Sequence, residues 1–119
     1  MVVSFCRNNT VNFINTKGVE LFHIGKDKTG SNTYEPVYSK HSNTVAVSPG
    51  GRRGYRCIKI IDIESKKVMT TIPMDTTIYG MAVRGRTIYY CAWDKGLRML
   101  DLNDQSVRDI INSDMSYVD

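Results

Sequence analysis

The sequence has few of the residues that bind metals or form disulfide bonds. Its 119 residues include only three cysteines and two histidines. Cys6, Cys57 and Cys91 are odd in number, have no CxxC spacing and stand among apolar or β-branched neighbours. These features predict reduced, half-buried cysteines in strands and exclude a disulfide framework or a zinc-binding module within these residues. We therefore expect no metal and no other cofactor.

Long hydrophobic runs and blocks of charge are also missing. No segment approaches the roughly 18 apolar residues that a membrane helix requires, and the segment 1–6 is too short for the core of a signal peptide. The 16 basic and 12 acidic residues give a net charge of only +4 and are scattered along the chain. We therefore expect a cytoplasmic protein with no membrane contact, and one domain spanning 1–119.

Helical periodicity is almost absent, whereas short runs rich in valine, isoleucine, tyrosine and threonine recur between turn residues. This pattern predicts an all-β protein. The clearest expected strands are 44–47, 57–63, 68–72, 78–83, 87–93, 97–102 and 107–111. Further strands are expected at 2–6, 10–15 and 19–24 and within 33–39.

Two hairpins repeat one another. The strand 58–63, a four-residue turn and a valine match the strand 97–102, a four-residue turn and a valine, always at an offset of 39 residues. A looser copy lies upstream, so that Asn15, Asp62 and Asp101 occupy equivalent places. A short carboxylate or amide can bond the backbone two residues on and open a tight hairpin. We therefore interpret these three residues as turn residues and not as an active site.

The repeated strands carry apolar residues on consecutive positions, as in Ile60-Ile61 and Met99-Leu100. Both faces of such a sheet must be covered. A period near 40 with four short strands and two covered faces predicts blades of a β-propeller. We expect about three four-stranded antiparallel blades, at roughly 1–39, 40–83 and 84–119, which form half of a six-bladed ring. Either the chain is a fragment of a longer protein, which we favour, or copies of the chain associate to complete the ring. The alternatives are a β-sandwich and a small barrel, which would not show this strict repeat.

The first part of the chain resembles an NHL repeat. The segment 8–25 runs asparagine, apolar strand, asparagine, glycine, then a Leu-Phe strand that ends in glycine. The segment 28–31 and Pro36 stand where that family has its Gly-rich loop and a proline. The later segments 57–63 and 79–83 look like the diverged propellers of invertebrate tripartite-motif proteins. The resemblance covers nearly the whole chain.

This resemblance implies a propeller at the C-terminal end of a chain similar to a ubiquitin ligase, where it recruits protein targets or, in some members, single-stranded RNA. We accordingly expect a non-catalytic binding module for a protein partner or ubiquitination target, with RNA binding as the alternative. Any RING domain would lie outside these residues. A second alternative is a metal-dependent enzyme like the lactonase propellers. The carboxylates to consider for its metal site are Asp62, Asp75, Asp101 and Asp114, whose regular repetition argues for turns.

The best candidate binding loop is 48–54, which is rich in glycine and leads into another strand. Arg52, Arg53 and Arg56 can present positive charge to phosphate or to an acidic peptide, and Tyr55 stands beside them as a stacking partner.

Tyr89, Cys91 and Trp93 share one face of a strand, and Tyr90 shares the other with Ala92. We expect the tyrosines to fill the space between blades and Trp93 to stand at the rim as a binding anchor, followed by Lys95. Further basic residues near turns could join one basic rim and support the RNA alternative. These residues are Lys59, Lys66, Lys67, Arg84, Arg86 and Arg98.

Overall fold

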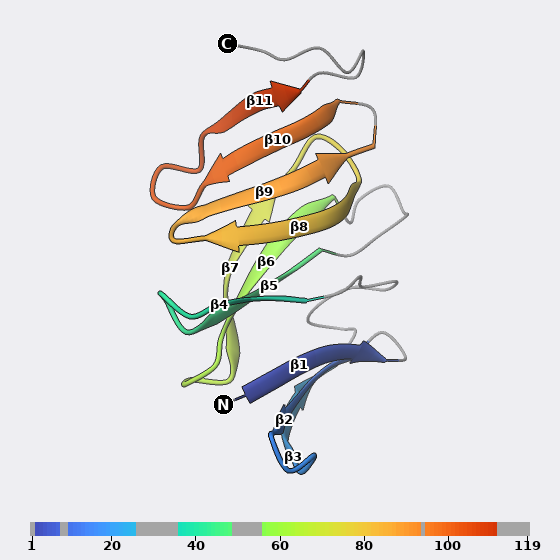
Figure 1. The fold of residues 1–119 in the computed structure, drawn as a ribbon, viewed down its shortest axis with the longest axis vertical. Coiled ribbons are helices and arrows are strands. Elements are labelled where there is room, and N and C mark those ends of the chain that lie inside the picture. Colours follow the sequence, from blue (N-terminus) through green and yellow to red (C-terminus); the bar gives the residue numbers. More distant parts are fainter. Residues whose placement is uncertain (1, 8–9, 26–35, 49–55, 94, 112–119) are drawn as a thin grey trace.

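The computed structural model describes residues 2–7, 10–25, 36–48, 56–93 and 95–111, and for 2–7 and 111 the backbone alone. The strands in these ranges form three antiparallel sheets stacked along the long axis of the molecule (Figure 1). The all-β prediction is therefore confirmed. None of the described residues forms a helix that is long and apolar enough to cross a membrane.

The sheets follow one another along the sequence. The first contains β1 (Val2–Arg7), β2 (Thr10–Asn15) and β3 (Glu20–Ile24). The second contains β4 (Val37–Ser39), β5 (Thr44–Val47), β6 (Cys57–Asp62) and β7 (Lys67–Pro73). The third contains β8 (Ile78–Arg84), β9 (Thr87–Ala92), β10 (Gly96–Asp101) and β11 (Val107–Ile111). Neighbouring strands in each sheet are consecutive in sequence, so each sheet is a simple meander.

The expected blade boundaries after 39 and 83 are wrong. β4 pairs with β5 and belongs to the second sheet, and β8 pairs with β9 and belongs to the third. Short connections at 40–43 and 85–86 join these pairs, and strands joined by such short turns pair with each other in antiparallel fashion. The sheets are therefore separated by the segments 25–36 and 74–77.

The expectation of four strands in every blade also needs correction. β2, β6 and β10 are equivalent, because each ends in an Asn or Asp and leads into a tight turn that closes at a residue with positive φ, and β1, β5 and β9 are their preceding partners. Within the described residues the first sheet has no strand equivalent to β4 and β8. We call the edge formed by the first strand of each sheet its inner edge. The inner edge of the first sheet is therefore β1, and the inner edges of the other two sheets are β4 and β8, which lie close together.

The turns after β2, β6 and β10 confirm the interpretation of Asn15, Asp62 and Asp101. Their side-chain oxygens accept hydrogen bonds from the backbone N–H groups of Lys17, Ser65 and Asn103 at 2.9, 2.9 and 2.7 Å. Hydrogen bonds from the Ser65 side chain and backbone lower the pKa of Asp62. Each turn then closes through a residue with positive φ. The recurring acidic and amide residues therefore shape hairpins.

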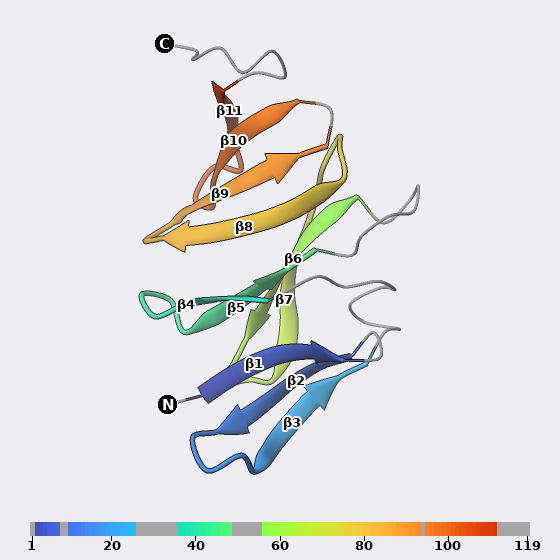
Figure 2. The same ribbon diagram turned by 45° about the vertical axis from the view of Figure 1, so that its right-hand side comes forward.

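The second sheet lies between the other two, and the views in Figures 1 and 2 agree on this order. Its neighbouring residues Ile60 and Ile61 point to opposite sides and enter two separate cores. The core shared with the third sheet contains Ala46, Ile58, Ile60, Ile72, Ile78, Ile88, Tyr90, Ala92 and Leu100. The core shared with the first sheet contains Val11, Phe13, Ile24, Val45, Val47, Ile61 and Ile63. The prediction that both faces are covered is thus confirmed for the second sheet.

In the third sheet the same prediction holds for only one face. Leu100 is fully buried against the second sheet, whereas Met99 lies on the outer face and is half-buried. No other sheet of the described chain covers that face (Figure 1).

Candidate binding site at the inner strands

Two aromatic side chains lie exposed where β8 begins and β9 ends. The ladder between these strands shifts register between Ile78 and Gly80, so that Tyr79 lies at an irregular step. The Trp93 backbone N–H donates a hydrogen bond to the Thr77 carbonyl oxygen at 2.9 Å. The rings of Tyr79 and Trp93 approach to 5.5 Å between centroids at an interplanar angle of 54°. Trp93 is 72% and Tyr79 45% exposed, so the pair offers a large apolar surface to solvent.

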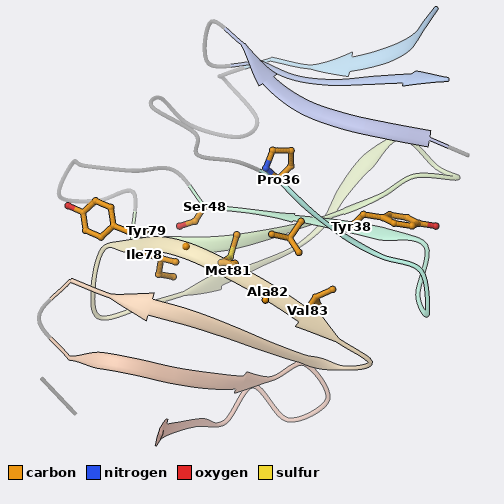
Figure 3. Close-up of a pocket in the computed structure, with 10 residues that line it drawn as sticks. Pro36, Tyr38, Ser48, Ile78, Tyr79, Met81, Ala82 and Val83 are labelled. Carbon is orange, nitrogen blue, oxygen red and sulfur yellow. The ribbon is translucent and has the colours of Figure 1, made fainter. Parts of the chain in front are cut away.

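A groove of about 430 Å³ adjoins this pair, between β4 and β8. Figure 3 shows Tyr79 and Tyr38 at its opposite ends, with Met81 and Val83 between them along β8. The lining residues are Pro36, Val37, Tyr38, Ser48, Ile78, Tyr79, Gly80, Met81, Ala82 and Val83. None of them is charged, but polar groups contribute about as much of the lining surface as apolar groups, so the groove suits an uncharged occupant.

The segment 74–77, which leads into β8, is tied to the third sheet by Arg98. The Arg98 guanidinium donates hydrogen bonds to Asp109 Oδ1 at 2.6 Å and to Asp75 Oδ1 at 3.2 Å. Burial alone would lower the pKa of Arg98, but the hydrogen bond with Asp109 and the surrounding negative charges outweigh it and raise the pKa. Arg98 therefore stays charged and holds Asp75 close to the third sheet. Because Thr77 follows in the same segment and bonds Trp93, Arg98 also helps to place the aromatic pair.

The structure describes three of the six predicted site residues. Arg56 and Trp93 are exposed, and Lys95 is half-buried. β6, β8 and β10 start at the same end of their sheets, at the right of Figure 1, so these three residues belong to one rim. The Arg56 carbonyl accepts a hydrogen bond from the Met74 N–H at 2.8 Å, which links the start of β6 to the segment before β8. The other three predicted residues, Arg52, Arg53 and Tyr55, lie outside the described residues.

Tyr79 and the groove were not predicted. The segment 78–83 was assigned to the second blade, so Tyr79 was not paired with Trp93 of the third. The signal that could have found it is the short turn at 85–86, which makes β8 and β9 a hairpin. In that hairpin the beginning of β8 meets the end of β9.

The further basic residues do not gather at one rim in the described chain. Turns of a meander alternate between its two ends, so Lys66, Lys67 and Arg86 lie at the end opposite Lys95 (Figure 1). Arg98 is held between two carboxylates. The positive charges of the described chain are thus divided between two rims and the interior of one sheet.

The carboxylates considered for a metal site are also dispersed. Asp62 and Asp101 belong to turns, Asp75 pairs with Arg98, and Asp114 lies outside the described residues. In the part of the chain that the structure describes, no three His, Cys, Asp or Glu side chains gather as metal ligands. Burial raises the pKa of the Cys57 thiol, which disfavours its reactive thiolate form.

Comparisons with protein-family models and with curated proteins give no match. Among solved structures, the chain is similar to the Pan2 WD40 domain of Neurospora crassa, with a TM-score of 0.68 and 18% identity over 91% of this chain and 32% of that one. It is also similar to the Cps50 (Swd1) β-propeller domain of Myceliophteria thermophila, with a TM-score of 0.72 and 10% identity over 92% of this chain and 35% of that one. A third similar structure is Saccharomyces cerevisiae Sqt1, with a TM-score of 0.68 and 10% identity over 91% and 30%.

The chain thus spans about a third of the length of the solved chains that it matches. The NHL relationship and the six-bladed ring stay predictions, because these likenesses bear on the fold alone. The prediction of a partial propeller is confirmed, and the chain has the fold of part of a WD40-like β-propeller, built from antiparallel sheets of which two have four strands in the described residues.

Proposed function

We propose that this chain is a non-catalytic binding module that holds an extended segment of a protein partner against the Tyr79–Trp93 pair and the adjoining groove. Propellers of this kind generally serve as binding modules. The observation that carries the proposal is the exposed aromatic pair, which stands beside an uncharged groove. Exposed tryptophan and tyrosine side chains are the residues most often found as energetic anchors of protein interfaces.

The chemistry of the site favours apolar side chains in the partner. Desolvation of Trp93 and Tyr79 by an apolar group would be favourable, since each aromatic ring loses a large contact with water. In the described residues β8 is the edge strand of its sheet and runs along the groove, and an extended peptide can add to an edge strand through backbone hydrogen bonds. As the resemblance to tripartite-motif propellers implies, the partner is a protein that a longer chain would recruit for ubiquitination.

The rim also carries Arg56 and Lys95, which an acidic residue of the partner can approach. Charges at the rim of an interface mainly affect the association rate and contribute little to affinity. We therefore assign the affinity to the aromatic pair and a secondary role to the basic residues.

The test uses a phage-displayed library of random peptides of about 12 residues, panned against the purified chain. We expect enrichment of peptides that contain apolar or aromatic residues. Trp93→Ala should weaken their binding by about tenfold or more, because removal of an interface anchor costs roughly 2 kcal/mol. The control is Met69→Ala, since Met69 is 61% exposed but lies on β7, at the far side of the second sheet from the groove.

Labelled single-stranded RNA is titrated in parallel at low and high salt. Binding through phosphates weakens steeply as the salt concentration rises, whereas an apolar peptide site responds little. RNA binding that depends on salt and on Arg56, with no peptide enriched, would contradict the proposal in favour of the RNA alternative. Peptides that bind equally well to the Trp93→Ala variant would contradict the assigned site.

A further inference from the structure

The three sheets stack with the same polarity, so each has a front face toward the next sheet and a back face toward the previous one. In β2, β6 and β10 the equivalent positions can be aligned through the shared turn. The front-face residues are Val11 and Phe13, Ile58 and Ile60, and Leu97 and Met99. The back-face residues are Asn12 and Ile14, Lys59 and Ile61, and Arg98 and Leu100.

Two contacts between a front face and a back face are made within the chain. Val11 and Phe13 of the first front face pack against Ile61 of the second back face. Ile58 and Ile60 of the second front face pack against Leu100 of the third back face. All of these side chains are at most 6% exposed. A front face of one sheet and a back face of the next therefore form a repeated dry interface.

The front face of the third sheet has no such cover in the described chain. Leu97 and Met99 are half-buried, and across the ladder they pair with Cys91 and Tyr89 of β9. These four side chains form one continuous apolar surface on the outside of the molecule. By its position in the repeat, this surface is equivalent to the buried pair Ile58 and Ile60.

The back face of the first sheet is the matching open surface. Ile14 occupies the place of Ile61 and Leu100, which are both fully buried, yet Ile14 is only half-buried. Asn12 pairs with His23 of β3 on the same face. The described part of the chain thus leaves one front face and one back face uncovered. In the two contacts within the chain, faces of these two kinds bind each other.

The charges at the edges of these two surfaces are complementary. Arg108 near the start of β11 lies beside Met99, with its Nη2 3.3 Å from the Met99 Sδ. Glu20 at the start of β3 lies beside His23, with its Oε1 3.2 Å from the His23 Nδ1. β3 and β11 are the outer strands of equivalent hairpins, so stacking front to back would bring an arginine near a glutamate.

We propose that the front face of the third sheet binds the back face of the first sheet of a second copy of this chain. Each copy then uses both of its open surfaces, and two copies close a ring through two identical head-to-tail contacts. A ring of two copies would contain six sheets, which lies within the range of about four to eight blades found in propellers. The Tyr79–Trp93 pair stands at the rim, so peptide binding there does not depend on this contact.

The first measurement is sedimentation equilibrium of the purified chain. We expect a single species of twice the 13.5 kDa mass of one chain. A monomer at concentrations of about 100 μM, or a polydisperse aggregate, would overturn the proposal and leave the proposed peptide site unaffected. A dissociation constant of about 100 μM corresponds to a standard binding free energy of about −5.5 kcal/mol.

Two single variants then test the polarity of the contact. Met99→Asp places a carboxylate in every front face, and Ile14→Asp places one in every back face. Each contact needs one intact front face and one intact back face. Both variants should therefore self-associate at least about 100-fold more weakly than the wild type. Both positions are half-exposed in one copy, so a charged side chain there can remain solvated in the folded monomer. Met69→Asp is the matched control and should remain a dimer.

Mixing the two variants gives the sharpest outcome. The intact front of Ile14→Asp can bind the intact back of Met99→Asp, so an equimolar mixture should form a 1:1 pair although neither variant dimerises alone. An unfolded chain could not form this pair, so the mixture also reports folding. A dimer of Ile14→Asp alone would indicate front-to-front packing and would overturn the proposal, as would a mixture that remains monomeric.

Discussion

Tyr90 places a hydroxyl group inside the interface between the second and third sheets. Its side chain is fully buried, and within the described residues the hydroxyl oxygen makes no hydrogen bond of good geometry, although the nearby Arg98 guanidinium partly opposes the effect of burial on its pKa. A buried polar group without a partner costs about 1–3 kcal/mol, whereas an apolar group of the same shape carries no such cost. Tyr90 therefore contributes a well-packed ring at the expense of an unsatisfied oxygen.

We predict that Tyr90→Phe leaves stability unchanged or raises it by about 1 kcal/mol, because the ring contacts remain and the unpaired hydroxyl is removed. Urea unfolding followed by tryptophan fluorescence measures the change. Tyr90→Leu is the control and should be destabilising, since it leaves a cavity in the same core. A loss of more than about 1 kcal/mol in Tyr90→Phe would show that the hydroxyl has a stabilising partner.

The same residue makes stability depend on alkaline pH. Burial raises the pKa of Tyr90 in the folded chain above its usual value of about 10. The unfolded chain loses this proton at a lower pH than the folded chain does. The contribution of neutral Tyr90 to the free energy of unfolding is therefore fully present below about pH 10 and is lost as the pH rises beyond that value. Tyr90→Phe should therefore lose less stability than the wild type when urea unfolding is repeated above pH 10.

At the scale of the element, the three equivalent turns solve one backbone problem with different residues. The residue that closes each turn has a positive φ, which is 80° for Gly18, 60° for Lys66 and 59° for Gln105. A side chain makes this conformation unfavourable by roughly 1–2 kcal/mol, whereas glycine adopts it freely. Only the first turn uses the residue that fits best.

Gln105→Gly should therefore stabilise the chain by about 0.5–1 kcal/mol, after the added entropy of glycine in the unfolded state is subtracted. Thermal unfolding followed by circular dichroism measures the shift. Lys66→Gly is an informative comparison, because the Lys66 Nζ lies 5.7 Å from the centre of the Phe22 ring. Loss of that contact should cancel much of the gain. Equal gains in both variants would show that the contact contributes nothing.

The local parts of the fold could be predicted because their signals are local. Asp62 and Asp101 mark turns through bonds to nearby backbone, and β2, β5 and β11 span the expected residues. The placement of β4 and β8 depends on which neighbour each strand pairs with, and the spacing of apolar residues does not contain that information. The register shift at Tyr79 also depends on the pairing of β8 with β9. The sequence therefore predicts Trp93 as a binding residue but not its partner Tyr79.

At the scale of the whole molecule, the consecutive residues Ile60 and Ile61 show how the sheets depend on one another. Both belong to β6, yet Ile60 lies in the core shared with the third sheet and Ile61 in the core shared with the first. The stability of a repeated stack is approximately the sum of each unit and its contacts with its neighbours. The sequence could predict that both faces are covered, but which sheet covers each face follows only from the order of the stack.

Ile60→Ala and Ile61→Ala should therefore each cost about 2–4 kcal/mol, because each opens a cavity in a dry core, but they should loosen different parts of the molecule. Amide hydrogen exchange, read by mass spectrometry, separates the two effects. Ile60→Ala should raise exchange mainly in β8 to β11, and Ile61→Ala mainly in β2 and β3. Each variant is the matched control for the other, since the two differ by one position in the same strand. If both variants raised exchange uniformly over all three sheets, the chain would unfold as one cooperative unit, and the contacts between sheets would not act as separate interfaces.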